Sequence, residues 1–234
     1  MKLDRSVAKR VLDVVDAGLI NGIGEPTPGK MCVEAAVCYA MGLPHGDDPP
    51  CVGAAVRALK IPLNDAGWSS NQARAKGMRQ VAIAQLGSKD INQKAFSAYV
   101  AEQTIRRILP LALRAAAKLG VNFAESLEAA AVRCENEGTE AAADAAACAA
   151  ADAADAACAA AADAAAADAA ACAACAAAYA AYAADAACAA AYAADAACAA
   201  DEVLSLAATI AVEALVKLGS EGAQWLDLCN EVAA

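Results

Sequence analysis

The chain has 234 residues, a formal net charge of −10, 60% hydrophobic residues and only 4% aromatic residues. This length allows one domain or two small ones with a sizeable core. No run of large apolar residues reaches the roughly 18 needed to span a bilayer, and charged residues occupy the place of a signal peptide's apolar stretch. We therefore expect a cytoplasmic protein without a membrane span.

The part of the chain before Gly138 predicts helices separated by turns rich in Gly and Pro, and no strand. Apolar residues recur at helical spacing, and Ser69 or Ser70, Asp90 and Asn122 are suitable N-caps. We expect Pro110 to kink its helix, and a loop around Pro62 to separate two others. In chain order, the expected helices are 5–20, 30–41, 51–60, a helix from Ser69 or Ser70 to Leu86, 91–119 and 123–137.

The most unusual segment is 140–201, in which 44 residues are Ala and the other 18 are Asp, Cys, Tyr and one Glu. These 18 residues recur about every 3.6 positions, which is the α-helical repeat. No Gly or Pro interrupts the chain from Glu140 to Leu218, and Ala is the best helix former. The segment is therefore predicted to be helical, with a single stripe of other residues along an Ala surface.

A continuous helix over 140–218 would be on the order of 120 Å long, far beyond the size of a compact domain of this length. It must protrude or fold back. The largest irregularities of the stripe occur between Cys158 and Asp168, so we favour a hairpin turn near 159–167. The alternative is one extended rod that packs against 91–137 or another chain.

These patterns predict an all-α fold, a helical bundle of short N-terminal helices with a very long Ala-rich helix or helical hairpin. We expect three regions. Residues 1–138 form a helical N-terminal region, residues 139–219 the Ala-rich part, and residues 220–234 a tail that packs on the bundle through residues such as Trp225.

The Asp residues of the stripe cannot be buried unpaired, so the stripe should face solvent or basic partners while the Ala faces pack. Six Cys also lie on the stripe, and thiolates on helices can store soft metals. Only Cys172 and Cys175 have a short C-x-x-C spacing, and single-base changes among Ala, Asp, Tyr and Cys codons explain the composition without a metal.

Charge is distributed unevenly along the chain. Residues 1–56 carry 5 basic and 7 acidic groups, residues 57–118 carry 11 and 3, and residues 119–234 carry 2 and 18. The basic middle suggests an anion-binding surface. We favour the alternative that it lies over the acidic helix in the same molecule or a neighbouring copy, because no phosphate loop or interleaved aromatic residue supports nucleic-acid binding. The candidate anion-binding residues are Arg74, Lys76, Arg79, Arg106 and Arg107, with Arg114 and Lys118 in the same basic region.

Residues 31–52 contain the only His of the chain together with several Cys and acidic residues. Cys32, His45 and Cys51, with Glu34 or Asp47 in support, would suit a zinc ion. A Cys–His nucleophile pair with an acidic residue that orients it is a second interpretation. The third is a capped turn with buried Cys, in which no chemistry occurs.

The string M-C-x-E-A-x-x-x-Y-x-x-G-x-P-H-x-D-x-P-x-C-V, over residues 31–52, resembles a segment of uncharacterised bacterial and phage-encoded hypothetical proteins, several of which carry Ala-rich tracts. The Asn64–Asp65 pair and the sequence QWLDL near Trp225 are similar to other parts of that group. The resemblance implies no function, but it suggests that the Cys, His and acidic residues of the segment belong together.

Two functions follow as hypotheses. The first is an interaction or assembly protein, a homo-oligomer or the partner of another protein, that uses closely packed Ala helices and an acidic surface in a phage or mobile-element setting. The second is a small metal-dependent or Cys–His effector enzyme with its site in residues 31–52. Nucleic acid and membrane are not the favoured partners.

Overall fold

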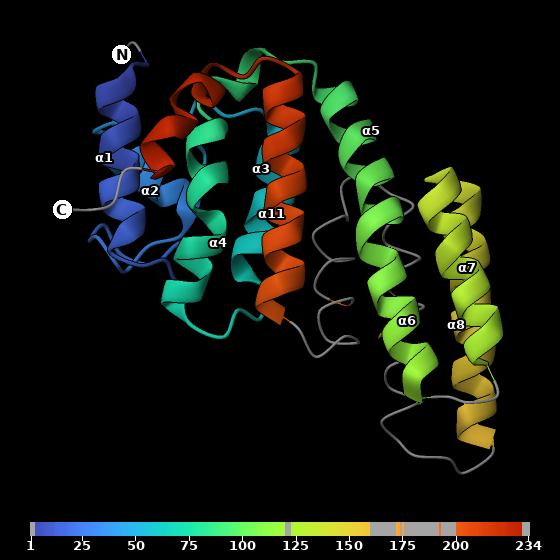
Figure 1. Cartoon of the computed structure of the whole chain (residues 1–234). Helices are drawn as coiled ribbons and strands as arrows, with labels where there is room; N and C mark the ends of the chain where they lie inside the picture. The colour runs from blue at the N-terminus through green and yellow to red at the C-terminus, as the bar shows by residue number, and fades with distance from the viewer. Residues whose placement is uncertain are drawn as a thin grey trace. The chain divides into compact units, whose positions relative to one another are not determined.

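The computed structural model describes residues 3–119, 123–159 and 200–230, and between the last two ranges Cys172, Ala173, Cys175 and Tyr192. The protein is an all-α helical bundle, as the periodicity predicts (Figure 1). Within the described ranges there is no β-strand, and Gly24 and Met31 form an isolated bridge. The α-helices are α1 (Arg5–Asp16), α2 (Val33–Ala40), α3 (Ala54–Asp65), α4 (Asn71–Ala84), α5 (Gln93–Gln103), α6 (Leu109–Leu119), α7 (Ala124–Glu137), α8 (Glu140–Ala159) and α11 (Ala200–Lys217).

The chain forms two compact units. Unit 1 comprises Met1–Ser97 and Ala208–Ala234, and unit 2 comprises Ala98–Ala207. The division falls within α5 and within α11. It does not follow the compositional boundary at Gly138, because α7 and α8, on either side of that residue, pack against each other in unit 2.

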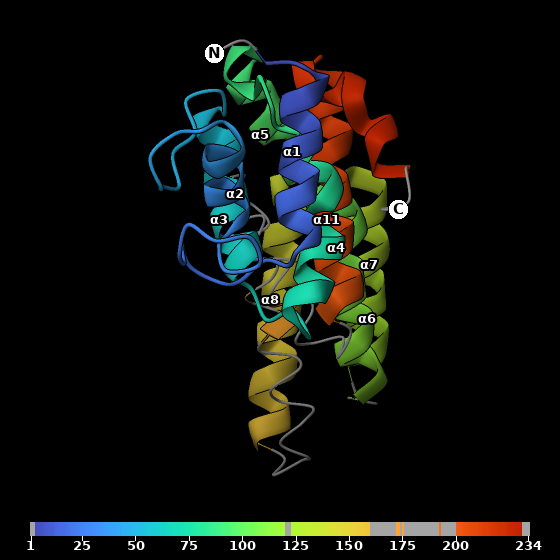
Figure 2. The ribbon, with the colours of Figure 1, turned by 90° about the vertical axis from the view of Figure 1, so that its left-hand side faces the viewer.

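In unit 1, α1 packs against α2 and α4, and α2 also packs against α3 (Figure 2). Asp4 caps α1 by accepting a hydrogen bond from the Val7 N–H, and the predicted apolar face of α1 is buried through Val11 and Val15. The helix ends at Asp16 rather than at residue 20, because Gly18 takes a positive φ of 115° and turns the chain.

The expected loop around Pro62 is wrong, since Pro62 lies inside α3, which continues to Asp65. A proline in a helix removes a hydrogen bond and crowds the preceding turn, so it usually ends or bends the helix. In α3 the residues Val56, Leu59 and Leu63 share one face and are all buried. Their burial outweighs the local cost of the proline.

Helix α4 begins where the sequence predicts, because Ser70 caps it by accepting a hydrogen bond from the Ala73 N–H. The C-terminal 3₁₀ segment η4 (Glu221–Asn230) packs against α4 and α1. Ser220, just before η4, donates to the carbonyl oxygens of Ala84 and Leu86 at 2.6 and 3.1 Å. The start of η4 is thereby joined to the end of α4.

The predicted helix 91–119 is divided in the structure. A 3₁₀ turn, η1 (Ser88–Asp90), contains the expected cap Asp90, and Asn92 instead caps α5 by accepting from the Ala95 N–H. The π-helical segment η2 (Thr104–Ile108) separates α5 from α6. Pro110 follows it directly. A proline removes one helical hydrogen bond and needs room for its ring, and a π-bulge accommodates both.

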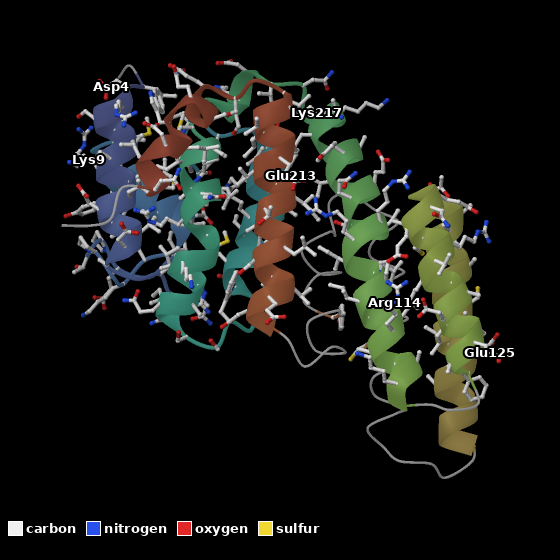
Figure 3. The ribbon with its side chains drawn as sticks, in the orientation of Figure 1. Asp4, Lys9, Arg114, Glu125, Glu213 and Lys217 are labelled. Carbon is white, nitrogen blue, oxygen red and sulfur yellow. The ribbon has the colours of Figure 1, made fainter. Side chains whose placement is uncertain are left out.

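In unit 2, α7 packs against both α6 and α8. Arg114, labelled on α6 in Figure 3, forms ion pairs with two acidic residues of α7, Glu128 at 2.9 Å and Glu135 at 2.5 Å. Gly138 ends α7 with a φ of 61°, and Thr139 caps α8 through the Ala142 N–H. The end of α7 agrees with the predicted helix 123–137, whereas the predicted cap Asn122 lies outside the described residues.

The Ala-rich helix α8 presents its stripe as predicted over the described side chains. Glu140, Asp144, Cys148 and Asp152 are exposed, whereas a row of Ala residues on another side of the helix is buried, namely Ala142, Ala143, Ala146, Ala150 and Ala153. The described parts of the 140–218 segment are mainly α8 and α11, so the very long helix stays a prediction. The predicted turn near 159–167 lies outside the described side chains.

No helix in the described ranges combines the length and the apolar composition that crossing a membrane requires.

Candidate functional site: a buried ion pair beside an acidic cavity

The first turn of α2 carries two of the residues singled out from the sequence. Cys32 is the N-cap, and its sulfur accepts a hydrogen bond from the Ala35 N–H at 3.4 Å. Glu34 lies in the first turn and is completely buried. A carboxylate is favoured at a helix N-terminus because of the helix dipole and the free N–H groups, but burial removes the water that would solvate it.

The partner of Glu34 is Lys60 of α3, which is also completely buried. Lys60 Nζ lies 2.5 Å from Glu34 Oε1. The contact is close but poorly directed, so neither atom forms a hydrogen bond of good geometry, and Glu34 Oε2 has no hydrogen-bond partner among the described residues. An unpaired buried acceptor costs about 1–3 kcal/mol, so a donor placed against Glu34 Oε2 would stabilise the site.

Burial raises the pKa of Glu34, and the charge of Lys60 opposes this shift. Burial lowers the pKa of Lys60, and the charge of Glu34 opposes that shift in turn. Both shifts have the same physical cause, because removal from water penalises the charged form of each group. Unit 1 thus holds an acid and a base whose pKa values have moved toward each other.

Asn64 and Asp65, at the end of α3, connect this site to the loop before α2. Asn64 is buried, and its Oδ1 accepts from the Val33 N–H at 3.2 Å. Its Nδ2 donates to the Ile20 carbonyl oxygen and to Asp65 Oδ1. Asp65 Oδ1 also accepts from the Gly22 N–H. These bonds hold the α2 N-terminus against the end of α3.

Asp47 is held by Arg57 of α3. Arg57 donates from Nε to the Asp47 carbonyl oxygen at 2.7 Å and from Nη2 to Asp47 Oδ1 at 3.0 Å. The Asp47 side chain is 42% exposed, so this ion pair is worth little for stability. The ion pair instead positions the Asp47 carboxylate, since it holds this part of the 43–51 turn close to α3.

A cavity of about 160 Å³ lies between these groups. Its polar lining consists of Cys32, Glu34, Asp47, Asn64 and Asp65. The remaining lining comes from the loop before α2 and from apolar residues of α2 and α3, and neither Lys60 nor Arg57 takes part. Every charged residue that lines the cavity is therefore acidic.

The structure does not bring Cys32, His45 and Cys51 together as a metal site. His45 is exposed, and its Nε2 donates to the Gly24 carbonyl oxygen at 3.0 Å. The Cys51 thiol instead contacts the sulfur of Met41 at 3.6 Å. No cluster of three or more His, Cys, Asp or Glu with metal-binding geometry exists in the part of the chain that the structure describes.

The Cys–His interpretation has no geometric support either, because the thiols and His45 have other partners. Burial raises the pKa of Cys32 and of Cys51, and it raises the pKa of Cys38 to about 11. A thiol with a raised pKa is a poor nucleophile at neutral pH. These side chains are therefore suited to packing, and only Cys32 also lines the cavity.

The candidate anion-binding residues have different environments. Arg74 is buried and donates to the carbonyl oxygens of Asn64 and Leu19, and Arg79 pairs with Asp16. Arg106 donates to three carbonyl oxygens at the end of α7, where it satisfies helix-terminal groups. Lys76 lies in unit 1, and Arg106 and Arg107 lie in unit 2.

Sequence reasoning missed Lys60, Arg57 and the roles of Asn64 and Asp65. A Lys on the apolar face of a helix is a usable signal, because Lys60 lies four residues after Val56, on the same side of the helix. The predicted end of that helix at residue 60 concealed this signal. The other missed contacts join segments far apart in the sequence, so no local pattern indicates them.

No protein-family model matches the chain, and neither the curated proteins nor the solved structures include a significant match. The function must therefore be argued from the residues of the site and from the surface alone.

Proposed function

We propose that the protein is an interaction or assembly protein, and that the acidic face of the Ala-rich helix α8 is the surface it uses. The occupant of that face is a second copy of the chain or a basic protein partner. A phage or mobile-element setting and a cytoplasmic location belong to the same proposal. The resemblance of residues 31–52 to phage-encoded proteins supports the setting.

The observation that carries this proposal is the arrangement of α8. It buries one row of its Ala residues within unit 2 and exposes Glu140, Asp144 and Asp152. Within the described part of the chain, none of these three acids forms an ion pair with a Lys or Arg. Arg114 pairs with acids of α7 instead. A face of this kind favours a basic partner electrostatically.

We expect the association to weaken with added salt, because exposed charges are screened beyond about 10 Å at 0.1 M ionic strength. The measurement is mass by light scattering at low and high salt. Replacing Asp144 and Asp152 by Asn should reduce the mass at low salt. The matched control replaces exposed Asp13 and Asp90 of unit 1 by Asn, which removes the same charge elsewhere. A mass that depends on neither salt nor the α8 substitutions contradicts self-association through this face.

The second candidate function is a small effector enzyme that binds a small molecule in the cavity beside α2. The observation that favours it is the meeting of Cys32, Glu34 and Asp47, all from residues 31–52, on one cavity next to a buried acid–base pair. Groups with pKa values shifted by burial are found preferentially at functional sites. Zinc is not the favoured cofactor of this candidate, since its proposed ligands have other partners.

A further inference from the structure

We propose that the cavity beside α2 binds a small organic cation that carries N–H donors, of the primary ammonium class, with Glu34 as its buried anchor. This inference rests on the second candidate function and names its ligand. Asp47 and Asp65 complete the negative lining around the cation.

The charge of the cavity selects a cation. Glu34, Asp47 and Asp65 line it, and no Lys or Arg does. Lys60 neutralises part of the charge of Glu34, but it contacts Oε1 and leaves Oε2 without a hydrogen-bond partner in the described structure. An ammonium group supplies the donor that this oxygen lacks, together with the positive charge that balances Asp47 and Asp65.

The size and the ligand geometry favour an organic ammonium over a metal ion. The cavity, of about 160 Å³, is smaller than the sites of drug-sized ligands and suits a ligand of a few heavy atoms. A metal ion requires three or more ligands converging at short distance, and no such cluster occurs in the described ranges. An ammonium group needs only separate acceptors within hydrogen-bond reach, and Ile61 and Val33 supply an apolar wall for its alkyl part.

The test is thermal unfolding of the full chain with methylammonium chloride, compared with tetramethylammonium chloride at equal ionic strength. A ligand that binds only the native state stabilises it by RT ln(1 + [L]/Kd), so Tm rises with the logarithm of the ligand concentration above Kd. We expect methylammonium to raise Tm with this concentration dependence and tetramethylammonium, which lacks N–H donors, to have no such effect. Equal shifts with both cations would overturn the proposal.

Two variants locate the effect. Asp47→Asn keeps the buried pair intact, and the double variant Glu34→Gln/Lys60→Met removes the anchor without leaving Lys60 unpaired. Each should lose the methylammonium shift, whereas Asp13→Asn on the exposed face of α1 should keep it. A shift that persists in both cavity variants overturns the assignment.

Neutral acetamide separates the failure of this inference from the failure of the effector function. Stabilisation by acetamide instead of methylammonium, lost in the same cavity variants, would overturn the cation class and keep the cavity as a ligand site. The absence of a variant-sensitive shift with either compound would overturn both.

Discussion

Glu34 and Lys60 are the residues whose chemistry departs furthest from expectation, because two opposite charges lie fully buried in unit 1. Such a pair is weak evidence for stability, since the loss of hydration offsets the attraction between the charges. Removing one partner is a different matter, because it leaves the other charge buried alone. Removing one charge should therefore lower the stability of the protein, whereas removing both should leave it unchanged or raise it.

We expect Glu34→Gln to destabilise the protein by about 3–5 kcal/mol, because Lys60 is left without a counter-charge. The double variant Glu34→Gln/Lys60→Met should restore stability to the wild-type value or raise it by about 1–4 kcal/mol. Urea unfolding followed by circular dichroism measures both. A single variant as stable as the double variant would show that the pair is not buried as described.

The pH dependence follows from the directions of the pKa shifts. The folded pKa of Glu34 is raised, so the folded state binds its proton more tightly than the unfolded state, and stability falls as pH rises from about 4.3 through the folded pKa. The folded pKa of Lys60 is lowered, so stability recovers as pH rises from that value to about 10.4. The free-energy difference between the wild type and the double variant, measured against pH, isolates both effects.

At the scale of elements, the junction of α4 with η4 depends on a close approach of two backbones. The Gly222 N–H donates to the Leu86 carbonyl oxygen at 2.6 Å. A Cβ at Gly222 would collide with the Ile83 carbonyl oxygen, which belongs to the rigid end of α4. A side chain at this position must push η4 away from α4.

We expect Gly222→Ala to destabilise unit 1 by about 1–3 kcal/mol, the usual cost of forcing extra volume into a packed contact. The matched control is Gly67→Ala, since a Cβ at Gly67 meets nothing within 4 Å. Thermal unfolding of the two variants compares them directly. Equal Tm values would contradict the close contact between Gly222 and Ile83.

At the scale of the whole molecule, unit 1 is built from both ends of the chain, since residues 208–234 return to pack with residues 1–97. Trp225 and Leu228 of η4 are buried, and η4 contacts both α1 and α4. Trp225 and Leu228 are therefore part of the core of unit 1, and their contribution to stability should be that of core residues.

Trp225→Ala should cost about 3–5 kcal/mol, because it removes a large buried side chain and leaves a cavity. Val216→Ala on α11 is the control, since Val216 is 50% exposed and its truncation should change stability by less than about 0.5 kcal/mol. Urea unfolding monitored by circular dichroism gives both values. A small effect of Trp225→Ala would mean that η4 is not part of the core.

The sequence by itself determined the all-α class, a cap at Ser69 or Ser70, the Gly138 end of α7 and the solvent-facing stripe of α8. Each of these depends on interactions within about one helical turn, which a sequence pattern records directly. Only the tertiary structure decided that α3 continues through Pro62 and that Glu34 meets Lys60. It also decided that His45 and Cys51 do not line the cavity that Cys32 and Asp47 share. These outcomes depend on burial and on contacts between distant segments, whose free energies outweigh local preference and leave no periodic trace in the chain.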